Sequence, residues 1–241
     1  TVVDHAEHAF VLADGHYVCD CGAVAIARIQ RDTEVHYYSD LNTIIAIAER
    51  LDEGTITVLE DNGLTPEHRG GLELTSGTFT LDLNGKTFKE DISFVGTANV
   101  TVKNCNASSG LLTVHGANAS LTLESADGAE VNVYDEGSFT VPVGCDPQVR
   151  RLEAYSANIS LGGGYYELLT SEGKTLAEIV AEGCGYKQGS SWLTNPPERD
   201  AAKVTVTQYP ITKAETPLSF DEPLVYGTAY GDEHYAYAKV A

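Results

Sequence analysis

The sequence predicts a mainly β protein whose centre is a parallel β-helix, a solenoid of about five or six coils. A triplet made of an apolar residue, Thr or Ser, and a second apolar residue recurs about every twenty residues between positions 56 and 161. A second series of alternating segments runs between the triplets with the same step. Two short period-2 strands per repeat are typical of solenoid coils, and neighbouring coils must stack because one coil cannot bury its own apolar face.

The two series align the predicted coils. The triplets are Ile56-Thr57-Val58, Phe79-Thr80-Leu81, Val100-Thr101-Val102, Leu121-Thr122-Leu123, Phe139-Thr140-Val141 and Ile159-Ser160-Leu161. The second series is Leu72-Glu73-Leu74, Ile92-Ser93-Phe94, Leu112-Thr113-Val114, Val131-Asn132-Val133 and Leu152-Glu153-Ala154. Because side chains alternate along a strand, the middle residues of the triplets are expected to form one outward column from Thr57 to Ser160.

Residues beside the triplets are expected to serve the fold. The residue after a triplet gives the column Asp82, Lys103 and Glu124, whose alternating signs predict charge pairing between strands. Gly or Asn stands before several triplets, where these residues allow the positive φ of a tight bend. The bend positions are Gly77, Asn99, Asn118, Gly137 and Asn158.

A helix is predicted to cover the N-terminal end of the solenoid, which we place at residues 35–209. Residues 35–38 favour a strand. The segment from Leu41 to Leu51 then shows helical apolar spacing, and Gly54 ends it. Such a capping helix would shield the open edge of the first coil.

The C-terminal end is predicted to carry a second, short helix and a covering tail. Thr175 and Glu178 form a capping box for a helix near residues 175–183. A further triplet follows at Val204-Thr205-Val206. The segment 210–241 is rich in Tyr, and we expect it to cover the far end of the solenoid or to begin another module.

Residues 1–30 are predicted to form a small separate unit that holds a structural zinc ion. Two His three residues apart precede an aromatic residue, and two Cys follow a turn; two imidazoles and two thiolates suit tetrahedral zinc. The ion would stabilise a segment too short for its own core. The segment resembles Cys/His knuckles of bacterial surface proteins, with Cys-x-Cys in place of their Cys-x2-Cys. The alternatives are a small disulfide or two thiols, and His16 could replace either His. The predicted ligands are His5, His8, Cys19 and Cys21.

The composition disfavours several classes of partner. The chain carries 35 acidic residues against 15 Lys and Arg, a formal charge of −20. Nucleic acids and anionic membranes both attract cationic surfaces, so neither is expected as a partner. No apolar run is long enough to span a bilayer. The chain begins at Thr1 and contains no Met, so we expect an excised piece of a longer protein whose leader and anchor are missing.

Cysteines inside the repeats are predicted to be buried thiols. Cys105 and Cys145 stand two coils apart, which places them roughly 9–10 Å apart at the spacing of stacked strands. That separation is too long for a disulfide. We therefore expect both side chains to fill the interior of the coils as small apolar groups.

Several segments resemble pectin-lyase-like right-handed parallel β-helix proteins. They are the strand-helix-strand opening, Leu81-Asp82-Leu83-Asn84-Gly85-Lys86, Lys174-Thr175-Leu176-Ala177-Glu178 and Cys184-Gly185-Tyr186-Lys187. More narrowly, they are similar to large multi-domain surface proteins of Gram-positive gut bacteria. The resemblance covers roughly residues 35–210 and implies a right-handed β-helix on a surface protein. Its motifs are not catalytic fingerprints and imply no particular activity.

Candidate catalytic groups are sparse in the repeats. Asp127, Glu130, Asp135 and Glu136 could hold calcium or form a glycosidase pair. Scattered surface acids of a strongly acidic protein explain them better, so we expect no calcium site and lean away from an enzyme. His115 is the only His of the repeats, and a lone His is expected to be structural.

We therefore hypothesise a non-catalytic, secreted or cell-wall-attached module that binds a host or neighbouring-cell ligand, a glycoprotein or an immunoglobulin. The repeats, the acidity and the Tyr-rich tail motivate this hypothesis, since Tyr offers a large contact area with a polar tip. One rival is a carbohydrate-active enzyme, a polysaccharide lyase or glycoside hydrolase acting on a glycan; the other is a structural spacer of a larger surface protein. The predicted ligand-binding residues are Tyr226, Tyr230, Tyr235 and Tyr237.

Overall fold

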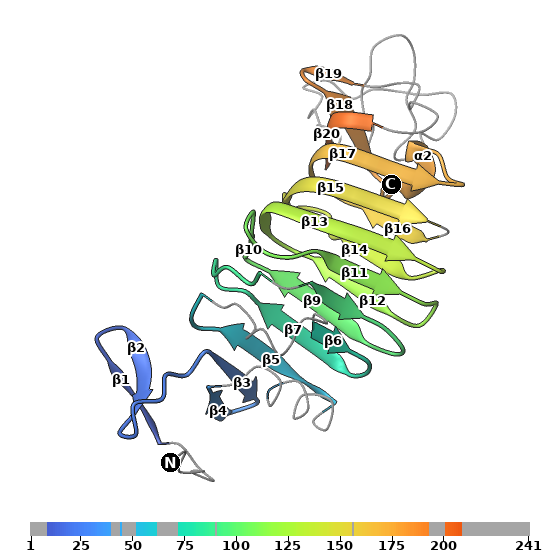
Figure 1. Ribbon diagram of the computed structural model, residues 1–241. Coiled ribbons are helices and arrows are strands. Elements are labelled where there is room, and N and C mark those ends of the chain that lie inside the picture. Colours follow the sequence, from blue (N-terminus) through green and yellow to red (C-terminus); the bar gives the residue numbers. More distant parts are fainter. Residues whose placement is uncertain are drawn as a thin grey trace, which may run out of the picture.

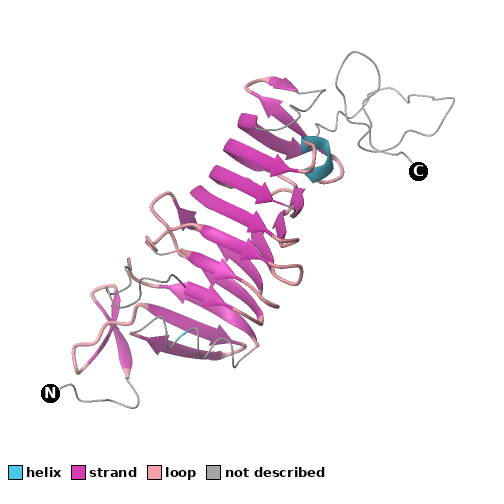
Figure 2. Cartoon of the chain, turned by 45° about the vertical axis from the view of Figure 1, so that its right-hand side comes forward, coloured by secondary structure: helices cyan, strands magenta, loops and turns pink. Residues whose placement is uncertain are grey.

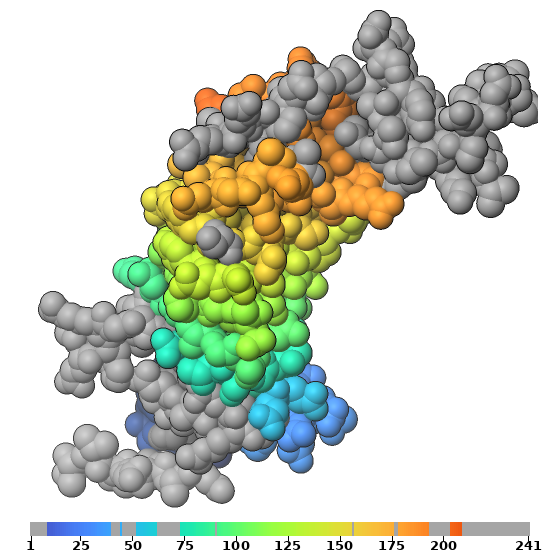
Figure 3. Space-filling model, turned by 90° about the vertical axis from the view of Figure 1, so that its right-hand side faces the viewer, coloured from blue at the N-terminus to red at the C-terminus, as the bar shows by residue number. Residues whose placement is uncertain are grey.

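The computed structural model shows a β-solenoid of about five turns, elongated along the direction in which the turns stack (Figure 1). It describes residues 9–39, 44, 52–61, 72–89, 91–155, 157–192 and 201–208. Successive turns follow one another along the long axis in sequence order (Figure 3). The strands alternate between an eight-stranded and a ten-stranded sheet, which face each other across the core (Figure 2). This confirms the predicted parallel solenoid.

The eight-stranded sheet is built from the triplets. Thr80, Thr101, Thr122 and Thr140 lie opposite one another on successive parallel strands, and Ser160 continues the column. In chain order its strands are β3 (Ala27–Arg31), β4 (Glu34–Tyr38), β5 (Glu53–Val58), β7 (Thr78–Asp82), β9 (Asn99–Lys103), β12 (Ser120–Leu123), β14 (Ser138–Val141) and β16 (Asn158–Leu161).

The ten-stranded sheet contains the whole second series in the predicted register. Leu72, Ile92, Leu112, Val131 and Leu152 are paired from strand to strand. The parallel strands are β6 (Leu72–Leu74), β8 (Ile92–Phe94), β11 (Leu112–His115), β13 (Ala126–Tyr134), β15 (Gln148–Tyr155) and β17 (Gly164–Glu172). The short strand β10 (Cys105–Asn106) pairs with β13 beside this path.

Alternation of side chains fills the core with one continuous apolar column. The flanking residues of each triplet face inward, whereas the middle Thr residues of β7, β9, β12 and β14 remain partly exposed. Val114, Val131 and Phe139 are all 0% exposed. Full burial of such a side chain contributes about 1.5–3 kcal/mol, so stacking of the turns supplies the stability that one turn lacks.

The first triplet departs from the predicted column. Thr55, not Thr57, lies opposite Thr80, and Thr57 pairs with Asp82 instead. Thr57 is only 7% exposed, so its predicted outward position on a wet face is wrong. Antiparallel pairing with β3 places Arg28 opposite Thr57, and the neighbouring Ile56 and Val58 are buried as well.

The residues before the triplets do not make the bends as predicted. Of the five predicted positions, only Gly77 has a positive φ; the left-handed residues otherwise come earlier, at Gly96 and Gly116 for example. Asn99 and Asn158 already belong to strands. Their side chains connect successive turns: Ser120 Oγ donates to Asn99 Oδ1 at 2.8 Å, and Asn158 Nδ2 donates to the Glu136 carbonyl at 2.9 Å.

The Asp82 carboxylate both pairs with a Lys of the next strand and accepts hydrogen bonds from the bends. Asp82 lies opposite Lys103, and Lys103 Nζ approaches Asp82 Oδ2 to 3.9 Å, as the predicted charge pairing requires. Asp82 Oδ1 also accepts from the backbone N–H of Asn84 at 2.9 Å and from Asn104 Nδ2 at 2.8 Å. Asn84 and Asn104 have φ of 53° and 55°, so these two Asn residues make the left-handed bends.

A β-hairpin covers the N-terminal end of the eight-stranded sheet. Strand β3 runs antiparallel to β5, and β4 runs antiparallel to β3. The predicted capping helix, from Leu41 to Leu51, lies outside the described residues except for Ile44, whose side chain is fully buried in the core. A separate hairpin precedes these strands and is formed by β1 (Phe10–Ala13) and β2 (His16–Cys19).

Antiparallel strands cover the C-terminal end of the ten-stranded sheet. β20 (Ala201–Gln208) pairs with β17, β18 (Cys184–Gln188) pairs with β20, and β19 (Ser191–Trp192) pairs with β18. The triplet Val204-Thr205-Val206 is therefore a strand, but it runs antiparallel in the ten-stranded sheet rather than adding to the eight-stranded one.

The predicted second helix is a single turn, α2 (Leu176–Ile179). The predicted capping box is present: Glu178 Oε2 accepts from the Thr175 backbone N–H at 2.7 Å and from its hydroxyl at 2.9 Å. These hydrogen bonds favour the carboxylate, so they lower the pKa of Glu178. The predicted covering tail, residues 210–241, lies outside the described residues.

The cysteines of the repeats largely follow the prediction. Cys105 is buried, and burial raises the pKa of its thiol to about 11. Cys184 is also buried and donates to the Gly162 carbonyl at 3.3 Å. Cys145 is half-buried and packs against the core. All three side chains are thiols rather than halves of a disulfide.

Candidate functional site

The predicted zinc ligands fall on the first hairpin and before it. Cys19 ends β2 and is half-buried, while Cys21 is exposed in the turn that follows. His5 and His8 lie outside the described residues, so the proposed ligand set stays a prediction. Within the described ranges, no group of three or more His, Cys, Asp and Glu side chains is arranged to hold a metal ion.

The first hairpin contacts the N-terminal end of the solenoid. Tyr17 stacks on Tyr37 of β4, with ring centroids 4.3 Å apart. His16 Nδ1 lies 2.5 Å from Glu60 Oε1, just after β5. An aromatic stack and a polar contact therefore fix the first hairpin against the first strands of the solenoid.

The four predicted ligand-binding Tyr residues, at positions 226, 230, 235 and 237, lie outside the described residues. The candidate carboxylates of the repeats are described, and they do not form one cluster. Glu130 lies on β13, whereas Asp135 and Glu136 occupy the bend after it, with φ of 49° and 65°. His115 has a partner: its Nε2 lies 2.6 Å from Asp135 Oδ2.

Polar and aromatic side chains gather on the outer face of β13 and β15. Glu130 lies opposite Arg151 and Asn132 lies opposite Glu153. We call this surface the Asn132 patch; its members are Glu130, Asn132, Tyr134, Arg150, Arg151, Glu153 and Tyr155. The patch follows from two aligned spacings in the second series, Glu130-x-Asn132-x-Tyr134 and Arg151-x-Glu153-x-Tyr155. The column of residues that follow the triplets, Asp82, Lys103 and Glu124, does not include any residue of this patch.

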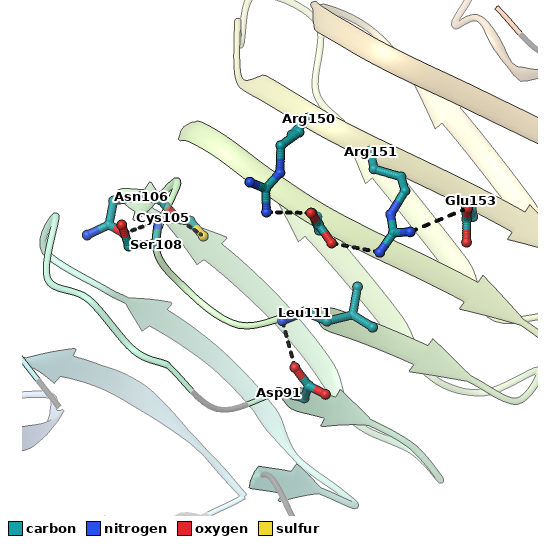
Figure 4. Close-up of polar contacts among 9 residues, drawn as sticks. Asp91, Cys105, Asn106, Ser108, Leu111, Arg150, Arg151 and Glu153 are labelled. Atoms are coloured by element: carbon teal, nitrogen blue, oxygen red, sulfur yellow. Dashed lines mark hydrogen bonds and ion pairs between the residues drawn. The ribbon is translucent and has the colours of Figure 1, made fainter. Parts of the chain in front are cut away.

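An irregularity in the pairing brings two Arg side chains to one carboxylate. Ala129 pairs with Val149 and Glu130 pairs with Arg151, so Arg150 is an extra residue on its strand. Such a bulge redirects a side chain that strict alternation would point elsewhere. Arg150 Nη2 contacts Glu130 Oε1, and Arg151 Nη2 lies 2.7 Å from Glu130 Oε2 (Figure 4).

The charges of the Asn132 patch are mutually paired. Besides Glu130, Arg151 also approaches Glu153, with Nη1 3.8 Å from Oε1 (Figure 4). The hydrogen bond to Glu130 raises the pKa of Arg151 above its ordinary value. Two acidic and two basic side chains thus cancel in formal charge, which gives a locally neutral surface on a chain whose net charge is −20.

Aromatic and amide groups continue the patch along the strands. Tyr134 and Tyr155 stack with centroids 5.3 Å apart and an interplanar angle of 6°. Asn132 Nδ2 donates to the Tyr134 hydroxyl at 2.9 Å. Arg and Tyr are the residue types that dominate recognition surfaces, and here a stack of strands holds them in place. The arrangement is suited to hydrogen bonding and stacking against a ligand.

The fold and the patch define the chain as a parallel β-solenoid with a polar, aromatic surface on its ten-stranded sheet. Comparison with protein-family models, with curated proteins and with solved structures finds no match. In the part of the chain that the structure describes, no helix is long and apolar enough to cross a membrane.

Proposed function

We propose that the chain is a non-catalytic binding module of a secreted or cell-wall-attached protein, of the kind that Gram-positive gut bacteria carry. Its ligand is a host or neighbouring-cell glycoprotein or immunoglobulin. The observation that supports this proposal is the Asn132 patch, which combines paired Arg residues with stacked Tyr residues on a rigid sheet. Side chains held in this way lose little entropy on binding, which favours recognition.

The proposed extracellular location rests on the acidity of the chain. A net charge of −20 keeps a surface protein soluble and dispersed. The Tyr-rich tail, with Tyr226 and Tyr237 among its residues, would add a second contact region. Nucleic acid remains disfavoured as a partner because a strongly acidic protein repels the phosphate backbone.

The binding function predicts selective capture through the Asn132 patch. We expect immobilised wild-type chain to retain a glycoprotein or immunoglobulin from serum or mucus, identified by mass spectrometry. Tyr155→Ala should weaken binding of that purified partner by about 2 kcal/mol, close to thirtyfold, as expected for a central aromatic contact. Surface plasmon resonance would measure the loss.

Thr122→Ala is the matched control, since Thr122 is partly exposed on the eight-stranded sheet. The control should bind like the wild type. Recovery of no partner from either fluid would overturn the proposed function. Equal binding by all three chains would place the contact away from the patch and contradict the site.

We also propose that the N-terminal segment holds structural zinc through His5, His8, Cys19 and Cys21. The support is the match between these residue types and tetrahedral zinc. Elemental analysis of the purified chain should find about one zinc per molecule, removable by a chelator with loss of local structure. A content below about half an equivalent would rule the site out, and Cys21→Ser should lower the content if the ligands are assigned correctly.

A further inference from the structure

Asn132 combines an outward position with near-complete burial. Its neighbours Val131 and Val133 are 0% exposed and face the core, so alternation places Asn132 on the outer face with Glu130 and Tyr134. Yet Asn132 is only 8% exposed. Its Nδ2 donates to the Tyr134 hydroxyl, whereas its buried Oδ1 has no hydrogen-bond partner among the described residues. Exchanging the amide oxygen and nitrogen would leave the nitrogen unpaired instead.

A second unpaired atom lies on the adjacent strand of the same patch. The terminal nitrogens of Arg151 pair with Glu130 and Glu153, but its buried Nε has no partner in the described part of the chain. Arg151 lies opposite Glu130, two positions before the Glu153 that lies opposite Asn132. Buried polar groups without partners are rare and costly in folded proteins. Of the three such side-chain atoms in the described part of the chain, the third being Arg28 Nε, two belong to neighbouring strands of this patch, and this concentration favours a ligand.

We propose that the Asn132 patch is a subsite for a neutral sugar residue of a glycan, one of whose hydroxyls hydrogen-bonds to both Asn132 and Arg151. This inference rests on the proposed binding function and specifies the part of the ligand that is recognised. A hydroxyl both donates and accepts, which an unpaired amide oxygen and an unpaired guanidinium N–H together require.

The paired charges and the two Tyr residues of the patch favour a neutral sugar over an acidic one. The charges of the Arg and Glu side chains of the patch already neutralise one another, with Arg150 and Arg151 both paired with Glu130. A uronate carboxylate would therefore find no uncommitted cation and would meet a strongly acidic protein. Tyr134 and Tyr155 add apolar surface beside the polar groups, the combination typical of small-ligand sites. Because Asn132 is only 8% exposed, a sugar would reach its amide after side chains around it shift, a common change on binding.

Affinity electrophoresis tests the subsite with defined probes. Gels would contain dextran, galactomannan or polygalacturonate. The chains compared would be the wild type, Asn132→Leu, Arg151→Lys and Arg31→Lys. We expect a neutral polysaccharide to retard the wild type, and polygalacturonate not to. Asn132→Leu and Arg151→Lys should each weaken binding about tenfold, the value of one hydrogen bond to a charged or buried group. Arg31→Lys is the matched control, because Arg31 also approaches a carboxylate, that of Glu53, but lies on β3 of the eight-stranded sheet. It should bind like the wild type.

Thermal melting separates ligand binding from a structural role of Asn132. If the amide is kept for a ligand, Asn132→Leu removes an unpaired amide oxygen together with one hydrogen bond to the Tyr134 hydroxyl. A buried unpaired group costs at least as much as one hydrogen bond contributes, so the melting temperature should stay equal or rise by a few degrees. A clear fall would assign Asn132 to the fold and overturn the inference. Equal losses of binding in Arg31→Lys and Arg151→Lys, or retardation by polygalacturonate alone, would also overturn it.

Failure of this inference differs from failure of the proposed function. The inference fails if neither neutral polysaccharide retards the wild type and a crystal structure shows a water molecule bridging Asn132 and Arg151. These two residues would then form a hydration site only. Capture of a protein partner that depends on Tyr155 would still support the binding module. Capture that is lost when the partner is enzymatically deglycosylated would support both.

Discussion

Gly163→Ala is expected to destabilise the chain by about 3 kcal/mol or more, because it places a methyl group inside the neighbouring turn. A Cβ at Gly163 would lie 1.9 Å from the Cys145 carbonyl oxygen, and one at Gly162 would lie 2.4 Å from the Val143 nitrogen. Both obstacles are backbone atoms of the preceding bend, which cannot move without shifting a whole turn. The Gly163 carbonyl also accepts from the buried Tyr166 hydroxyl at 2.9 Å, so the bend is held from the other side as well.

Urea and thermal unfolding, followed by far-UV circular dichroism, would measure this effect. For a chain of this length, the loss corresponds to a fall of roughly 6–12 °C in melting temperature. Gly85→Asn is the matched control: Gly85 has a φ of 67°, and a Cβ there meets no atom within 4 Å. Asn tolerates this conformation, so the control should cost less than about 1 kcal/mol. Equal stability of Gly163→Ala and the wild type would contradict the close approach of the two bends.

The stacking of the turns could be predicted because every segment of the second series has apolar residues at alternate positions. From Leu72 to Leu152, successive apolar pairs are 19 to 21 residues apart, and each meets its equivalent on the next strand. A register shift of one residue would turn the apolar set outward, so the pattern leaves one acceptable alignment. The Asp82–Lys103 pair followed in the same way from the register of the triplets in the eight-stranded sheet.

The ends of the stack were less predictable because their neighbours are different. Thr57 belongs to a triplet by pattern, yet β5 pairs with the antiparallel strand β3 on one edge and with the parallel strand β7 on the other, in a register that places Thr55 rather than Thr57 opposite Thr80. Val204 and Val206 likewise continue the pattern but reverse direction. Local sequence encodes which residues are strand-like; the partner of a terminal strand depends on the segment that reaches the open edge.

Part of the candidate site was readable, and part required the structure. Glu130 stood among the candidate acids, and the aligned spacing with Arg151, Glu153 and the two Tyr residues was present in the sequence. The sequence did not show that Asn132 is buried, because burial depends on side chains of adjacent turns. It also did not show that Arg150 is an extra residue on its strand, because this depends on an irregularity in the strand pairing. Alternation alone would have pointed Arg150 away from Glu130.

Phe139→Ala is expected to cost about 3–5 kcal/mol, the usual range for a buried Phe. Phe139 is 0% exposed, and it lies opposite Leu121 on one side and Ile159 on the other. Truncation removes contacts to both neighbouring turns and leaves a cavity that a stiff stack of strands cannot collapse into. Because each turn of a solenoid contacts only its neighbours, stability is close to a sum of adjacent interfaces, and the cavity weakens two of them at once.

Because Phe139 lies within the stack of turns, the exchange rates of the individual turns show which of them the substitution weakens. Hydrogen exchange followed by mass spectrometry should show the turns on the C-terminal side of β14 exchanging faster in Phe139→Ala, while β7 and β9 keep their protection. Val143→Ala is the control, since Val143 is 47% exposed and should change stability by less than about 0.5 kcal/mol. Uniformly faster exchange along the whole chain would mean that the solenoid unfolds as one cooperative unit, and a loss below about 1 kcal/mol would contradict the burial of Phe139.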